Sequence, residues 1–125
     1  MDSMQIRLLF KEAGIDYDTA LRRMMGKESL YYRFLKKFLE DENYAMLVKA
    51  AGQGDGDGAF RAAHTLKGLC GNLGMDRLLA AVSKTVEKLR SHQAETLPQD
   101  FLKDELLEVT RAYDEVVQAI SQAQI

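Results

Sequence analysis

Apolar residues recur along most of the chain at spacings of three and four positions, which is the period of a helix with one buried face. Between Glu28 and about Asp41 the pattern is formed by aromatic and leucine side chains, namely Leu30, Tyr31, Phe34, Leu35, Phe38 and Leu39. A second run extends from Asp76 to about His92, and a third follows Pro98, a residue that suits the first turn of a helix. Strand-like alternation is scarce, so the pattern predicts an all-α protein.

A fourth long helix is predicted from about Asp57 to Leu73, after the glycine-rich loop 52–58, where Asp55 or Asp57 would cap it. Residues 43–51 are expected to continue or follow the first long helix. Apolar spacing of this kind suits helices that pack nearly antiparallel, with crossing angles of about 20°. The long helices therefore predict an antiparallel four-helix bundle.

The N-terminal part of the chain predicts two shorter helices, Met4–Ala13 and Tyr17–Met25, each followed by a glycine. A chain of 125 residues can bury a single core of its own. We therefore expect one domain over residues 1–125, in which residues up to about 26 cover a bundle formed by residues 28–125.

Composition narrows the possible classes of protein. The net charge of −2 argues against a nucleic-acid binder, which usually carries a basic excess. The single cysteine excludes an intrachain disulfide and a zinc site of clustered thiolates. Met1–Phe10 is too short and too charged for a secretion signal, and no run approaches the ~20 apolar residues that cross a bilayer. We expect a cytoplasmic protein that binds no membrane, and a monomer, because no large apolar stripe is left exposed.

The stretch His64–Gly74 is the most informative part of the chain. It contains one histidine, a lysine one helical turn later, and glycines at 68, 71 and 74 within a segment that otherwise predicts helix. A glycine inside a helix costs roughly 1 kcal/mol relative to alanine. Several glycines beside one histidine therefore need a compensating reason, and we expect that a large partner must approach the imidazole closely.

A helical wheel at about 100° per residue separates two faces of this segment. The face opposite His64 is apolar and consists of Ala62, Leu66, Leu69, Cys70 and Leu73. The face within about 60° of His64 contains Phe60, Arg61, Lys67, Gly68 and Gly71. The imidazole is therefore predicted to point to solvent, with bare backbone beside it.

The chemistry open to this histidine is limited. Cys70 lies on the opposite face, so a catalytic pair is excluded, and His92 has no spacing that suits a metal site. An exposed imidazole is largely unprotonated near neutral pH and can carry a phosphoryl group as a labile phosphoramidate. Lys67 can place its ammonium beside the phosphoryl oxygens, and Arg61 adds positive potential.

The segment His64-Thr65-Leu66-Lys67-Gly68, followed by Gly71 and Gly74, resembles the signature of histidine-containing phosphotransfer (HPt) domains of multistep two-component signalling. The upstream stretches Gly14–Asp16, Ala20–Arg23 and Leu30–Tyr31 are similar to bacterial members. The likeness covers roughly residues 12–93. Leu69 and Cys70 depart from it, because many members carry alanine or serine there, and we expect this to alter packing and not chemistry.

The resemblance implies a four-helix bundle with an N-terminal covering helix, and a histidine that accepts phosphate from the aspartate of a receiver domain. It implies that His64 is phosphorylated, that Lys67 supports the phosphoryl group and that Gly68 provides clearance. Phe60, Arg61 and Gly71 would then belong to the docking face. The implied partners are receiver domains of response regulators and hybrid histidine kinases.

On this hypothesis the chain is a phosphoryl carrier and not an enzyme with its own turnover. It has no ATP-binding motif and lacks the carboxylates of a magnesium site, so no cofactor is expected and Mg²⁺ should come from the receiver. Two alternatives remain. An ATP-dependent histidine kinase could phosphorylate His64 directly, although such a module normally belongs to a longer chain and this sequence begins at Met1 without a kinase segment. The chain could also be a helical adaptor that never carries phosphate.

Overall fold

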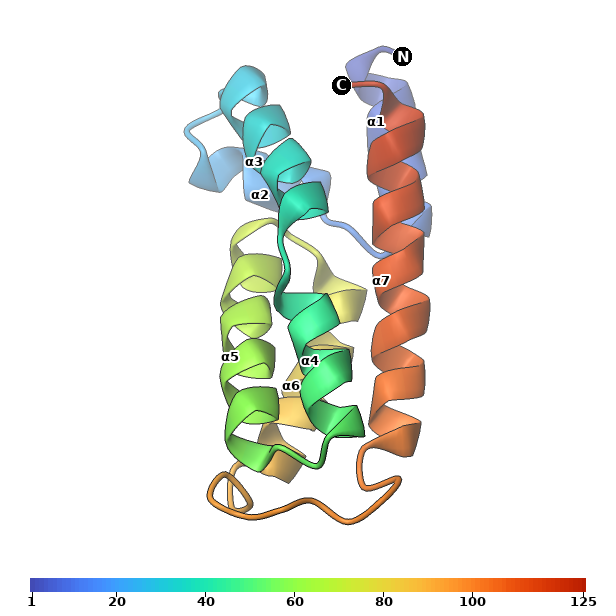
Figure 1. Ribbon diagram of the computed structural model, residues 1–125. Coiled ribbons are helices and arrows are strands. Elements are labelled where there is room, and N and C mark those ends of the chain that lie inside the picture. Colours follow the sequence, from blue (N-terminus) through green and yellow to red (C-terminus); the bar gives the residue numbers. More distant parts are fainter.

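The computed structural model describes residues 1–125 as seven helices, and the longest connection between them spans residues 90–102 (Figure 1). The helices are α1 (Ser3–Glu12), α2 (Tyr17–Arg23), α3 (Glu28–Glu40), α4 (Asn43–Gly52), α5 (Gly56–Asn72), α6 (Asp76–Leu89) and α7 (Lys103–Ala123). An isolated bridge between Asp55 and Thr96 is the sole strand-like pairing. The predicted all-α class is confirmed.

Four columns of helix form the bundle (Figure 1). The first column is α3 followed by α4, and contacts then run from α4 to α5, from α5 to α6 and from α6 to α7. At the upper end of the view, α1 lies against α7 and α2 lies against α3. The predicted bundle with short N-terminal covering helices is therefore confirmed.

A break at Asp41 and Glu42 separates α3 from α4. Asp41 has extended backbone, with φ −69° and ψ 138°, which ends α3. Its carboxylate then accepts a hydrogen bond from the backbone N–H of Asn43 at 2.9 Å. Residues 43–52 thus follow the first long helix as a separate element, because a single aspartate ends one helix and accepts from the first N–H of the next.

Two predicted helix ends were wrong. Pro98 is not in the first turn of the last helix, because residues 98–102 form a turn with Asp100 in the left-handed region and the helix begins at Lys103. The preceding helix ends at Leu89 and not at His92. There the N–H of His92 donates to the carbonyl of Leu89 at 2.9 Å, which turns the chain away.

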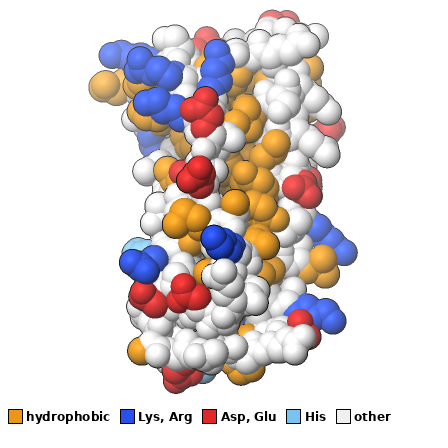
Figure 2. Space-filling model, in the orientation of Figure 1, with side chains coloured by type: hydrophobic (Ala, Val, Ile, Leu, Met, Phe, Trp, Pro, Cys, Tyr) orange, Lys and Arg blue, Asp and Glu red, His pale blue; other side chains and the backbone are white.

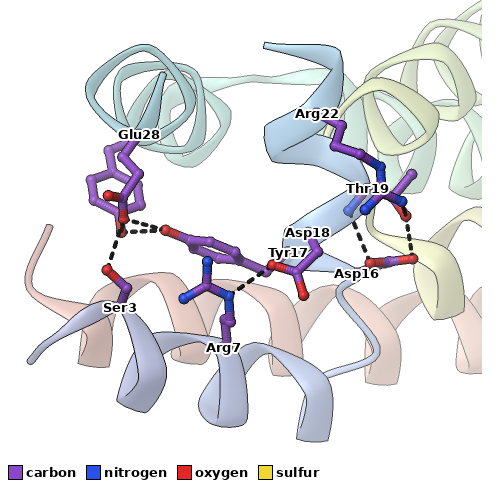
Figure 3. Close-up of polar contacts among 9 residues, drawn as sticks. Ser3, Arg7, Asp16, Tyr17, Asp18, Thr19, Arg22 and Glu28 are labelled. Carbon is purple, nitrogen blue, oxygen red and sulfur yellow. Dashed lines mark hydrogen bonds and ion pairs between the residues drawn. The ribbon is translucent and has the colours of Figure 1, made fainter. Parts of the chain in front are cut away.

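A polar cluster joins the N-terminal helices to α3 (Figure 3). The carboxylate of Glu28 accepts hydrogen bonds from the hydroxyls of Tyr17 at 2.7 Å and Tyr32 at 3.0 Å. The hydroxyl of Ser3 donates to the same carboxylate at 3.0 Å. These three hydrogen bonds hold the pKa of Glu28 below its ordinary value. One ionised carboxylate therefore connects α1, α2 and α3.

The N-terminal cover is also bound to the C-terminal end of α5. The N–H of Asp16 donates to the carbonyl of Gly74 at 2.7 Å. The buried hydroxyl of Tyr31 donates to the carbonyl of Leu73 at 2.9 Å. A helix end leaves its last carbonyls without partners inside the helix, so these contacts satisfy polar groups while they position α2 and α3 on α5. The cover therefore has a defined place beside the helix that contains His64.

Candidate functional site

His64 lies near the middle of α5 with its side chain exposed. Asp55 starts this helix, because its carboxylate accepts a hydrogen bond from the N–H of Gly58 at 2.9 Å. The opposite face of α5 is buried and contributes Ala62, Leu66 and Cys70 to the core. The ring nitrogens of His64 form no hydrogen bond within the chain, so both are open to a reaction partner. This is the orientation that the helical wheel predicts.

Phe60 lies one turn before His64 and supports its ring. The two ring centroids are 5.8 Å apart, and Phe60 is partly buried against the core. The guanidinium of Arg90, the residue after α6, lies 5.8 Å from the Phe60 ring. Phe60 is therefore near both His64 and the end of α6, and its contact restricts the positions of the imidazole.

Lys67 lies three positions after His64 on the same face of α5, and it forms no ion pair. On α6, the pKa of Glu87 is lowered chiefly by its hydrogen bond and ion pair with Arg90, and to a smaller extent by the charge of Lys67. Arg90 contacts this carboxylate at 2.9 Å. The ammonium of Lys67 is thus left for an anion that arrives beside His64.

Unlike Lys67, Arg61 forms an ion pair within the chain. Its guanidinium contacts the carboxylate of Asp57 at 2.9 Å, one turn toward the N-terminus of α5. Both side chains are exposed, and the pair partly cancels the positive potential that Arg61 would otherwise add near His64. Arg61 therefore lies on the predicted face but does not join the groups that surround the imidazole.

The presence of glycine at the three positions that follow His64 has two different physical explanations. A Cβ built at Gly68 or at Gly71 meets no atom within 4 Å, so this fold does not require glycine at either position. Gly74 has φ +73°, and a Cβ there would lie 2.5 Å from the carbonyl oxygen of Asp16. Gly74 is therefore needed by the fold, whereas Gly68 and Gly71 leave open backbone beside His64.

We expect Gly74→Ala to destabilise the protein by about 2–3 kcal/mol, because left-handed backbone and a close contact both oppose the methyl group. Gly26→Ala is the matched control, since Gly26 has φ +74° but nothing within 4 Å of its Cβ position. Its cost should be about 1 kcal/mol, from the backbone alone. Urea unfolding measures both, and equal losses would contradict the contact with Asp16.

A shallow depression surrounds this face of α5. Its lining consists of Arg23, His64, Lys67, Gly68, Gly71, Asn72 and Leu79. Four of these residues are on the predicted face, whereas Arg23 comes from α2 and Leu79 from α6. Wheel geometry cannot find Arg23 or Leu79, because each reaches the depression only through the packing of another helix. The doublet Arg22-Arg23 is visible in the sequence, but its place beside α5 is not.

Cys70 cannot take part in chemistry at His64. It is fully buried on the core face of α5, and burial raises the pKa of its thiol to about 12. No cluster of three or more His, Cys, Asp or Glu side chains that could hold a metal ion occurs in the structure. None of the helices combines the length and apolar character needed to cross a membrane. Nucleophilic chemistry of the imidazole is what this arrangement supports.

Comparison with known proteins gives one match. A family model described as the Hpt domain matches residues 33–123, which includes His64, Lys67, Gly68 and Gly71. Residues 1–32, with α1 and α2, lie outside the matched part. No curated protein and no solved structure matches the chain.

Proposed function

Because this chain belongs to the Hpt domain family, whose members transfer phosphoryl groups through a histidine in phosphorelays, we propose that His64 is its phosphorylated residue. The finer proposal is that His64 accepts the group from the aspartate of one receiver domain and delivers it to the aspartate of another. The observation that carries it is the exposed imidazole without a hydrogen-bond partner, beside two glycines that the fold does not need.

The proposed transfer begins with attack of an unprotonated ring nitrogen of His64 on the phosphorus of an aspartyl phosphate. A P–N bond forms as the P–O bond to the aspartate breaks, and the aspartate leaves as a carboxylate with the bonding electron pair. The other ring nitrogen can release its proton to water. In the second transfer a carboxylate of another receiver attacks phosphorus, and the imidazole leaves and regains a proton.

Each neighbouring residue has a proposed part in this reaction. Lys67 neutralises phosphoryl oxygens, since phosphoryl transfer depends mainly on positioning and charge. Phe60 restricts the imidazole, and Gly68 and Gly71 admit the partner's active site. We propose that the carboxylates of the receiver bind the Mg²⁺ that the transfer requires. This chain would act as a phosphoryl carrier without catalytic turnover of its own. We place the protein in the cytoplasm as a monomer that binds receivers transiently.

Transfer from purified receiver domains tests the proposal. A panel of receivers is phosphorylated with acetyl phosphate in Mg²⁺, freed of the small phosphodonor, and mixed with this protein. We expect a mass increase of one phosphoryl group, lost in acid as a phosphoramidate is. If only a histidine kinase with ATP labels the protein, direct phosphorylation by a kinase is favoured. If neither source labels it, the remaining hypothesis is a helical adaptor that never carries phosphate.

Lys67→Ala is expected to slow transfer about tenfold, which corresponds to the loss of one charge-assisted contact of roughly 1.4 kcal/mol. The fold should be unaffected, because Lys67 is half-exposed and unpaired. Rapid-quench measurement of phosphoryl transfer, together with the lifetime of the phosphohistidine, checks this. Lys49→Ala on α4 serves as the control for the loss of a lysine. An unchanged rate and lifetime in Lys67→Ala would remove Lys67 from the mechanism.

A further inference from the structure

Arg23 is the one charged side chain of the His64 depression that does not come from α5. It is the last residue of α2, and its guanidinium donates to the backbone carbonyl of Gly71. Gly71 is one of the two glycines that leave open backbone along the face of His64. The contact therefore places a cation from the N-terminal cover at the edge of the proposed docking face.

The charge of Arg23 is not neutralised within the chain. Four other arginines, Arg7, Arg61, Arg77 and Arg90, each contact a carboxylate, whereas Arg23 contacts only a carbonyl. A guanidinium has five N–H donors, so one carbonyl leaves most of them available. No acidic residue lines the depression, and its charged side chains are Arg23, Lys67 and His64 when protonated. The depression is therefore cationic in a protein with a net charge of −2.

The surface next to Arg23 has the same sign. Basic side chains gather over α2 and α3, at the upper left of the space-filling view (Figure 2). The exposed cations of these two helices and their connection are Arg22, Arg23, Lys27, Arg33, Lys36 and Lys37, and none of them forms an ion pair. A neighbouring groove between α2–α3 and the end of α5 shares Arg23 and Asn72 with the depression, and its other lining residues are Lys37, Asp41 and five apolar side chains. The two surfaces are thus continuous through Arg23.

A partner that brings an aspartyl phosphate and binds Mg²⁺ must present several carboxylates around its reacting group, because Mg²⁺ takes oxygen ligands. Such a face is complementary to a cationic one, and complementarity of this kind raises association rates and selects partners. We propose that the docking face extends from α5 onto α2 and α3, with Arg23 at the junction, and that it binds the carboxylate-rich face of a receiver domain. This inference rests on the proposed function.

Arg23 would then be a positioning residue, distinct in its effects from His64 and Lys67. Arg23 contacts Gly71, which is seven positions after His64 on α5. At that separation Arg23 would orient the partner and would not hold the transferred group. The family model does not include residue 23, so the inference depends on this chain's own packing of α2 against α5. Binding should change when Arg23 is replaced, while the lifetime of the phosphohistidine should not.

The test is a binding titration in Mg²⁺, without phosphoryl transfer, against every receiver of the transfer panel. We expect Arg23→Gln to weaken binding of the receiver bound most tightly by wild type about fivefold at low ionic strength, with the difference disappearing above about 0.5 M salt. Arg23→Lys, which keeps the charge, should bind within about twofold of wild type. Lys37→Gln should show a smaller loss with the same salt dependence.

Arg111→Gln is the matched control, because Arg111 is exposed and unpaired on α7 and does not line the depression. Equal affinity of Arg23→Gln and Arg111→Gln would overturn the inference, as would no binding of wild type to any receiver. Equal, salt-independent losses in Arg23→Gln and Arg23→Lys with a lowered melting temperature would show that Arg23 only holds α2 in place, which also overturns it. The proposed function fails separately, if wild type binds receivers but accepts no phosphoryl group from them.

Discussion

His64→Gln is expected to abolish phosphorylation by receiver domains while the bundle remains folded. Glutamine retains size and polarity but has no nucleophilic nitrogen, so the P–N bond cannot form. The side chain is exposed and has no hydrogen-bond partner in the chain, so its loss removes only the ring contact with Phe60 and should leave the fold intact. Intact-mass measurement after incubation with phosphorylated receivers gives the label, and helix content and melting temperature report the fold.

His92→Gln is the control, because His92 is the only other histidine of the chain. It lies in the turn after α6, where its ring is 4.9 Å from the ring of Phe101 and its Nδ1 is 2.9 Å from the carboxylate of Glu95. The ring and one nitrogen of His92 are thus engaged within this turn, and His92 does not line the depression around His64. We expect His92→Gln to accept the group as wild type does, and an acid-labile label on His64→Gln would refute the assignment of the site.

Gly68→Gln is expected to block docking without harm to the fold. The Cβ position is open, and glutamine favours a helix over glycine by roughly 0.5–1 kcal/mol, so stability should rise slightly. The new side chain would occupy the depression beside His64, where a partner must approach. A steric penalty of about 2 kcal/mol lowers affinity roughly thirtyfold. Titration with a receiver measures the affinity, and urea unfolding measures the stability.

Gly52→Gln is the control for Gly68→Gln, because it makes the same substitution outside the depression around His64. Gly52 is also an exposed helical glycine with nothing within 4 Å of its Cβ position, but it ends α4 and lies outside the depression. Its stability should change less than that of Gly68→Gln, because Gly52 is the last residue of its helix, and it should keep full affinity for the receiver. If Gly68→Gln bound receivers as tightly as Gly52→Gln, the open backbone beside His64 would have no part in docking.

Most of the helical architecture could be predicted because helix periodicity is a local property. Residues three and four apart share a face whatever the rest of the chain does, so α3, α5, α6 and α7 are visible in the spacing of apolar side chains. Helix ends were less predictable. Pro98 suits the first turn of a helix, but the backbone at Asp100 is left-handed and cannot be part of that helix. The helix therefore begins only at Lys103.

The central part of the candidate site was also visible in the sequence. The exposed position of His64, and the open backbone at Gly68 and Gly71, follow from one amphipathic helix. The left-handed backbone at Gly74 suits a helix end, but the close contact there could not be predicted, because the carbonyl that excludes a side chain belongs to Asp16, fifty-eight positions earlier. The ion pair of Arg61 with Asp57 could have been predicted from their spacing of four residues, which favours such contacts on a helix.

The chain's own pattern of residues thus specifies which helices form, which face of α5 is buried and which histidine reaches solvent, because each depends on neighbours within a turn or two. The surroundings of that histidine depend on contacts between helices. Arg23 borders the face because hydrogen bonds at Gly71 and Gly74 place the N-terminal cover on the end of α5. No local rule encodes that placement, because it results from packing between segments about fifty residues apart.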